Sequence, residues 1–195
     1  LNNKARLIYE FDGIKTFGSY LYPAFARKFR NLGAQICCMF QYDSRTTAEW
    51  NTDWDAHYLN WLYTPGKAVS FLIGGKVFRD LPRGAAYPTV GTEQRFGRCA
   101  VSFDRNLSIY CNESVYINSA PWDGWSPMRR PERPTLVIGV GESPYVSYGG
   151  TGVYMLRIDY AARNAVLTIN PDAVVVGDPW HPRADKSAVV LRRDK

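Results

Sequence analysis

Hydrophobic positions in the first part of the chain follow the pattern of alternating strands and helices. Arg6 to Phe11 and Ala34 to Tyr42 are short and largely apolar, which is typical of strands that are buried on both faces of a parallel sheet. Between them, apolar residues recur at three- and four-residue steps from Leu21 to Leu32, and Gly33 follows as a stop signal. The pattern predicts a strand, a helix that packs on the sheet, and a second strand.

Thr64 and Pro65 mark the start of a second predicted helix, because Thr is a favoured N-cap and Pro is tolerated in the first turn. The apolar pattern continues to Phe78. Gly74 and Gly75 lie inside this helix and weaken its propensity by ~1 kcal/mol each. We therefore expect both glycines to pack closely against a neighbouring element.

From about Leu81 the pattern changes to short alternating runs without helical periodicity. About eight such runs at near-regular spacing, separated by turns, predict an antiparallel β-sandwich. We therefore expect an α/β part at residues 1–82 and an all-β sandwich at residues 83–195. The predicted strands are Arg98 to Phe103, Leu107 to Tyr110, Ser114 to Asn118, Thr135 to Val140, Gly152 to Ile158, Ala165 to Ile169, Ala173 to Val176 and Ala188 to Leu191.

The α/β part is too small to stand alone, because only about two strand and helix units precede the change near Leu81. A complete (β/α)₈ barrel takes about 250 residues. The chain also starts at Leu1 rather than Met. We expect it to be the C-terminal part of a longer protein.

Composition and charge narrow the class of protein. With 46% hydrophobic and 22% charged residues, the chain is typical of globular proteins and not of disordered or collagen-like ones. The formal charge is +6, but the basic residues are scattered and often lie beside acidic ones, so nucleic acid is not an expected partner. No apolar run reaches the ~18 residues of a membrane span, and no signal peptide is visible.

The 4 Cys and 2 His do not have the spacing of a zinc site, and neither a metal nor another cofactor is expected. Cys37 and Cys38 are adjacent on one predicted strand and therefore point to opposite faces. Cys99 and Cys111 flank a predicted hairpin. They are cross-strand neighbours in one register and separated in the next, so the sequence leaves a disulfide open.

Carboxylates end both predicted parallel strands. Glu10 and Asp12 close the first strand and Asp43 closes the second, with Tyr9 and Tyr42 beside them. In α/β enzymes the reacting groups lie at the carboxyl ends of parallel strands, where loops surround an open crevice. The start of the chain therefore has the pattern of part of an active site.

The segment from Ser44 to Tyr58 carries Trp50, Trp54 and His57 among Asp, Asn and Thr residues. Flat aromatic rings cover the apolar faces of sugars, while amides and carboxylates bind sugar hydroxyls. A loop of this composition after a strand is what a sugar-binding cleft needs. The alternative is that its aromatic residues belong to a well-packed scaffold.

Several segments of the first part resemble one family of enzymes. They are Tyr9-Glu10-Phe11-Asp12, the helix from Ser19 to Arg27, Phe40-Gln41-Tyr42-Asp43, and His57-Tyr58-Leu59-Asn60. In order and context these segments look like the last two βα units of secreted bacterial TIM-barrel glycoside hydrolases of the retaining clan, whose members often carry a β-sandwich after the barrel. The resemblance implies the last βα units of a (β/α)₈ barrel followed by a β-sandwich, and an extracellular or periplasmic protein.

The resemblance implies that Glu10 is the catalytic nucleophile at the end of the seventh barrel strand. A retaining mechanism needs a second carboxyl group ~5 to 5.5 Å away, and this acid/base would come from outside the chain. For Asp12 and Asp43, capping of the following loop is the alternative to sugar binding, and Glu10 has the alternative of a salt-bridge partner. The expected substrate-binding residues are Tyr9, Asp12, Tyr42, Asp43, Trp50, Trp54 and His57.

Two functions from different classes follow. In the first, the chain is part of a glycoside hydrolase that acts on a poly- or oligosaccharide and completes its barrel with a missing N-terminal part. In the second, it is a non-catalytic carbohydrate-binding or structural sandwich joined to a degenerate barrel. Trp122, Trp125 and Trp180 lie in turns rich in Pro and Gly, and they fit either a second sugar platform or packing of the sandwich against the barrel.

Overall fold

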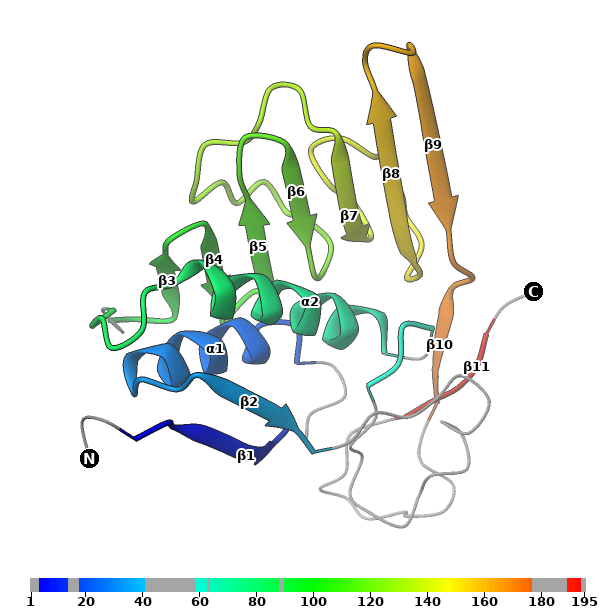
Figure 1. Cartoon of the computed structure of the whole chain (residues 1–195). Coiled ribbons are helices and arrows are strands. Elements are labelled where there is room, and N and C mark those ends of the chain that lie inside the picture. Colours follow the sequence, from blue (N-terminus) through cyan, green and yellow to red (C-terminus); the bar gives the residue numbers. More distant parts are fainter. Residues whose placement is uncertain are drawn as a thin grey trace.

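The computed structural model describes residues 4–13, 18–40, 59–62, 64–87, 90–176 and 189–193 of the 195-residue chain. Figure 1 shows these residues in three layers. A large sheet forms one outer layer, two helices lie against it, and a small parallel sheet lies on the other side of the helices.

The two strands and two helices that the periodicity predicts in the first part all form. The strands pair in parallel, with Leu7 opposite Ile36. Neither helix of the described residues is long and apolar enough to cross a membrane. The elements are β1 (Leu7–Phe11), α1 (Leu21–Asn31), β2 (Ile36–Met39) and α2 (Pro65–Asp80).

The large sheet has seven strands that follow one another in chain order. All neighbours are antiparallel except β6 and β7, which are parallel. Two further strands, β10 (Ala173–Val176) and β11 (Val189–Arg193), form a separate antiparallel pair. The seven strands are β3 (Glu93–Phe96), β4 (Cys99–Ser102), β5 (Leu107–Cys111), β6 (Val115–Asn118), β7 (Leu136–Val140), β8 (Val153–Asp159) and β9 (Asn164–Ile169).

The predicted fold class is wrong. The described residues contain two helices, one seven-stranded mixed sheet and two two-stranded sheets, which is not the helix-rich end of a (β/α)₈ barrel. The strands agree only in part with a β-sandwich, because seven of them belong to one sheet. Local alternation marks single strands correctly, whereas their assignment to one sheet or two depends on what covers each face.

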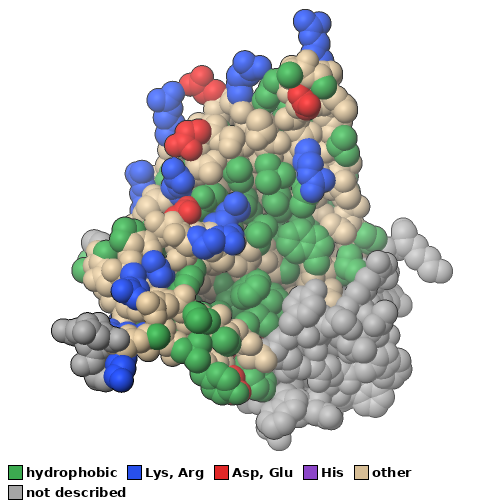
Figure 2. Space-filling view, in the orientation of Figure 1, with side chains coloured by type: hydrophobic (Ala, Val, Ile, Leu, Met, Phe, Trp, Pro, Cys, Tyr) green, Lys and Arg blue, Asp and Glu red, His purple; other side chains and the backbone are tan. Residues whose placement is uncertain are grey.

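One face of the large sheet is covered by the helices. Val69, Ile73 and Val77 of α2 form one buried cluster with Val101 and Ile117 of the sheet. The expected division between residues 82 and 83 stays a prediction, and side chains from both sides of it share this cluster. Hydrophobic side chains are also visible on the same face above α2, so the helices cover only part of the sheet (Figure 2).

The opposite face is covered by loops instead of a second sheet. Tyr116 and Tyr154 belong to the buried cluster there, and Trp122 and Trp125 pack against it. The Trp122 indole donates a hydrogen bond to the Trp125 carbonyl at 2.6 Å, and the Arg105 guanidinium lies over the Trp125 ring. These contacts favour the packing role for both tryptophans, while Trp180 lies outside the described residues.

The strand register excludes a disulfide between Cys99 and Cys111. Cys99 lies opposite Tyr110, so Cys111 is one position out of register. The two thiols consequently face opposite sides of the sheet, Cys99 in the cluster under the helices and Cys111 in the cluster under the loops. Both are free, and burial raises the pKa of Cys99 well above its usual value.

A group of serines joins the start of α1 to the large sheet. The hydroxyls of Ser108 and Ser119 both donate to the carbonyl of Ser19, and the Ser19 N–H donates to the Asn106 side chain at 2.8 Å. A Cβ at Gly66 would lie 2.4 Å from the Ser19 hydroxyl oxygen, so α2 approaches the same point closely. These contacts fix the position of α1 and of the residues that it presents to β1.

Candidate functional site

Glu10 is held in an unusual backbone conformation near the end of β1. Its φ is 54°, in the left-handed region that side chains other than glycine rarely adopt. Among the described residues Asn106 and Arg163 share this feature, but they lie in hairpin turns, where it is common. The pairing of β1 with β2 shifts between Ile8 and Phe11, so Glu10 sits in a β-bulge. Bulges redirect side chains and are frequent beside active sites.

Glu10 and Tyr9 lie in the open. The Tyr9 side chain is 72% exposed, and Glu10 is exposed as well. A hydrogen bond to Glu10 and the negative charge of its carboxylate raise the pKa of Tyr9, and Cys38 on the neighbouring strand contributes in the same direction. Both side chains are therefore accessible to solvent, and the Glu10 carboxylate affects the titration of the neighbouring Tyr9 hydroxyl.

The Asp12 side chain, in contrast, is buried. Its Oδ1 accepts a hydrogen bond from the Tyr22 hydroxyl and lies 3.5 Å from Nζ of Lys67. The side chains of Lys67 and Asp12 are only 0% and 3% exposed. Burial and the charge of Asp12 both raise the pKa of Tyr22, so its hydroxyl stays protonated and donates. Asp12 thereby connects β1 with both helices.

The bulge accounts for the contrast between the two carboxylates. In a regular strand, residues two apart share a face, so Glu10 and Asp12 would point the same way. The turn of the backbone at Glu10 breaks this alternation and leaves one carboxylate exposed and the other buried. An exposed carboxylate can attack or bind a ligand, whereas a buried one with a cation and a hydroxyl as partners serves to position the strand.

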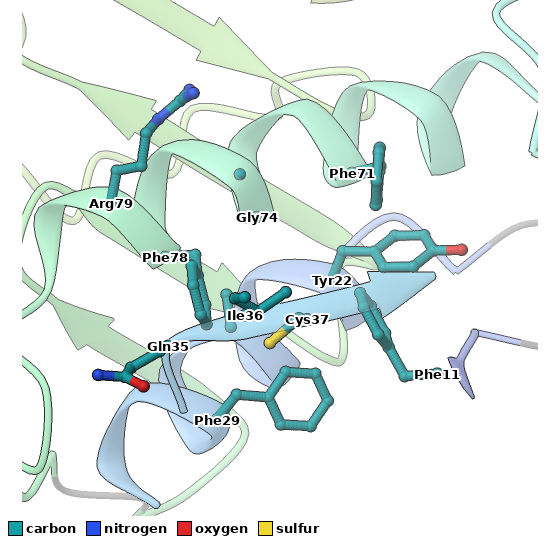
Figure 3. A pocket seen from close by; sticks show the side chains of 12 residues that line it. Phe11, Tyr22, Phe29, Gln35, Ile36, Cys37, Phe71, Gly74, Phe78 and Arg79 are labelled. Atoms are coloured by element: carbon teal, nitrogen blue, oxygen red, sulfur yellow. The ribbon is translucent and has the colours of Figure 1, made fainter. Parts of the chain in front are cut away.

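Between the small sheet and the two helices lies a half-open apolar cavity of about 350 Å³. Aromatic rings from β1, α1 and α2 line it, as the close view shows (Figure 3). Few hydrogen-bonding groups line this cavity. A sugar site requires several of them to bind the hydroxyls, so the cavity does not fit a sugar. The residues that the figure labels along it are Phe11, Tyr22, Phe29, Gln35, Ile36, Cys37, Phe71, Gly74, Phe78 and Arg79.

The two glycines of α2 differ in how closely other residues pack against them. A Cβ at Gly74 would lie 3.0 Å from the Tyr22 backbone, so the predicted close packing is confirmed there. A Cβ at Gly75 would meet nothing within 4 Å, and the prediction is wrong for this position. Gly75 instead lines the cavity.

Five predicted site residues lie outside the described residues, namely Tyr42, Asp43, Trp50, Trp54 and His57. Their roles stay predictions. Of the three others, Tyr9 and Glu10 lie together and are accessible, while Asp12 is held by contacts within the fold. Within the described ranges, no group of three or more His, Cys, Asp or Glu side chains is placed to hold a metal ion.

Sequence reasoning missed Tyr22 and Lys67, the two residues that hold Asp12. For Lys67 the sequence signal was weak, because α2 also carries Lys76 and Arg79, and the need for an acidic partner follows only from the burial of Lys67. For Tyr22 no comparable signal exists, since aromatic residues are ordinary on the packed side of a helix. The conformation of Glu10 also had no local signal, because Gly, Asn and Asp are the usual residues with positive φ.

Comparisons with known proteins found no relative of this chain. No protein-family model matches the chain, and neither the curated proteins nor the solved structures contain a significant match. No relative therefore supplies a role for Glu10 or for any other residue of this site.

Proposed function

We propose that Glu10 is the carboxylate nucleophile of a glycoside-hydrolysing site. The observation that carries the proposal is its place in a β-bulge with a φ of 54°, which presents the carboxylate to solvent near the carboxyl end of a parallel strand. A non-glycine residue in such a conformation outside a turn costs of order 1 to 3 kcal/mol, and strained residues of this kind cluster at functional sites.

The main alternative for Glu10 was a salt bridge at the strand end. Among the described residues, no Lys or Arg forms an ion pair with it. A salt-bridge partner also needs no bulge, because an exposed Glu in a regular strand reaches a cation equally well. Both points support a chemical role for the carboxylate.

In the proposed reaction, a carboxylate oxygen of Glu10 attacks the anomeric carbon of the sugar and the bond to the leaving oxygen breaks. The leaving oxygen takes a proton from a second carboxyl group, which then deprotonates the water that releases the sugar. Asp12 is unsuited to this second role, because its side chain is buried and Oδ1 is engaged by Tyr22 and Lys67. The acid/base is therefore assigned to residues outside the described part of the protein.

Tyr9 supports carbohydrate as the substrate class. Its exposed ring offers a flat apolar surface next to the carboxylate in the chain. Trp50, Trp54 and His57 stay predicted substrate-binding residues outside the described part of the chain. A poly- or oligosaccharide substrate fits the extracellular or periplasmic location that the resemblance implies.

Activated 2-fluoro glycosides test the nucleophile without an acid catalyst. A 2,4-dinitrophenyl 2-deoxy-2-fluoroglycoside needs no proton on its leaving group, and the fluorine slows hydrolysis of the covalent intermediate. We expect one member of a gluco, galacto, manno and xylo panel to add one glycosyl mass to the peptide that contains Glu10, with release of dinitrophenolate.

Glu10→Gln should abolish this labelling, while Glu113→Gln, which changes an exposed Glu in the turn between β5 and β6, should leave it intact. Labelling that persists in Glu10→Gln, or that no sugar of the panel produces, contradicts the proposal. Saturable oligosaccharide binding without any label would instead favour the non-catalytic binding module.

A further inference from the structure

The two edges of the seven-stranded sheet are built differently. At one edge, β3 exposes Glu93 and Arg95, and charges of this kind oppose pairing with another strand. At the other edge, all residues of β9 are exposed, and none of them is charged or a proline. Pairing of β9 with β8 has no bulge. Figure 1 shows β9 as the outermost strand of the sheet.

The free hydrogen-bonding groups of β9 can be assigned from its pairing with β8. The Asn170 N–H donates to the Val153 carbonyl at 2.9 Å, so the backbone groups of Asn170 point toward β8. Successive residues of an antiparallel strand point their backbone groups to alternate sides. Ala165, Leu167 and Ile169 therefore direct their N–H and C=O groups away from the sheet.

We propose that β9 pairs with β9 of a second copy of this chain, antiparallel and around a two-fold axis at Leu167. In this register Leu167 lies opposite its own symmetry mate and Ala165 lies opposite Ile169. All outward N–H and C=O groups of the three residues then find partners, which gives about six hydrogen bonds between the copies. A contact of a patch with itself is the isologous interface of a two-fold dimer.

The charges and side chains of β9 are compatible with pairing against β9 of a second copy. The paired residues are apolar or Thr, so no like charges are brought together. Arg163 precedes the strand and Asp172 follows its end, and an antiparallel partner places the beginning of one strand near the end of the other. Val166, Leu167 and Ile169 are each about half exposed in the single chain and would gain cover from the partner.

The pairing continues the hydrogen-bonded ladder that already joins β8 to β9. A contact of six residues a side is smaller than a standard stable interface. We therefore expect a weak dimer that dissociates on dilution. The inference is independent of the proposed chemistry at Glu10, because it concerns the edge strand β9 and not β1.

Sedimentation velocity of the 195-residue chain over a range of micromolar concentrations tests the dimer. Leu167→Lys places two like charges opposite each other at the axis, and should weaken association at least about tenfold. Val90→Lys changes an apolar residue that is more exposed and lies outside the sheet, and should leave association unchanged. Circular dichroism establishes that both variants keep the fold.

Cross-linking tests the register. In a Cys38→Ser background, which removes the exposed thiol, Leu167→Cys should form a disulfide between copies on mild oxidation. Opposed residues of a hydrogen-bonded pair have Cα atoms about 5.5 Å apart, within the range for disulfides. Val166→Cys should not form this disulfide, because Val166 lies opposite Thr168 of the second copy in the proposed register. A monomer at every concentration, a dimer that survives Leu167→Lys, or equal cross-linking at both positions overturns the proposal.

Discussion

The two sheets that carry the helices between them differ in how completely they are covered. Both faces of the seven-stranded sheet have buried clusters, one under the helices and one under loops. The parallel pair β1 and β2 packs one face against α1, while Leu7, Tyr9 and Ile36 stay more than half exposed. Parallel strands are usually covered on both faces. The large sheet therefore buries more of its apolar side chains than the small pair does.

The largest expected effect concerns the junction of the small pair with the helices. Lys67→Met leaves the buried Asp12 without its cation, and loss of one member of a buried ion pair costs about 3 to 5 kcal/mol. Urea unfolding measures this loss. The matched control is Arg129→Met, which breaks an exposed pair with Glu132 and should change stability by less than about 1 kcal/mol. Equal effects would mean that the Lys67 pair contributes no more than a surface contact.

A second pair of variants compares the two sheets directly. Ile117→Ala in the large sheet empties a fully buried site, and we expect a loss of about 2 to 5 kcal/mol in the free energy of unfolding. Ile36→Ala in the small pair removes a side chain that is 59% exposed, with an expected change of less than about 1 kcal/mol. Both are measured by denaturant titration. A large loss for Ile36→Ala would show that the open face of β1 and β2 is covered in solution.

A smaller effect of opposite sign is expected at Glu10. Glycine adopts a positive φ without steric cost, so Glu10→Gly should raise the free energy of unfolding by up to about 1 kcal/mol while covalent labelling is lost. Arg163→Gly makes the same change in the turn before β9 and should leave labelling intact. A stabilised variant without labelling is the outcome expected where strain serves function. Destabilisation by Glu10→Gly would argue that the bulge is a structural feature.

The smallest effect concerns the glycines of α2. Gly75→Ala meets no atom within 4 Å, and better helix propensity should stabilise the chain by about 0.5 to 1 kcal/mol. Gly74→Ala pushes a Cβ to 3.0 Å from the Tyr22 backbone and should be destabilising, because the backbone cannot move aside as a flexible side chain can. Thermal unfolding of the two variants should shift in opposite directions. Shifts of the same sign would mean that α1 and α2 pack less closely than the structure shows.

Local elements were predictable from the sequence. The apolar periodicity located both helices and both parallel strands, and the alternation after residue 81 located β4 to β11. β3 was missed, because its charged and polar residues do not carry an apolar alternation strong enough to mark a strand. Such an edge strand forms through its pairing with β4. The strand-end carboxylates were also visible, since Glu10 and Asp12 directly follow apolar residues.

By itself, the sequence determined where the chain forms helices and strands, because hydrophobic spacing and capping residues act over a few positions. Only the tertiary structure decided that seven strands share one sheet, that β6 and β7 run parallel, and that Cys99 and Cys111 face opposite sides. It also decided that Glu10 is exposed while Asp12 is buried with Lys67 and Tyr22. These outcomes depend on contacts between residues far apart in sequence. The facing of the two cysteines depends in addition on the register of β4 and β5, and a shift of one residue would reverse it.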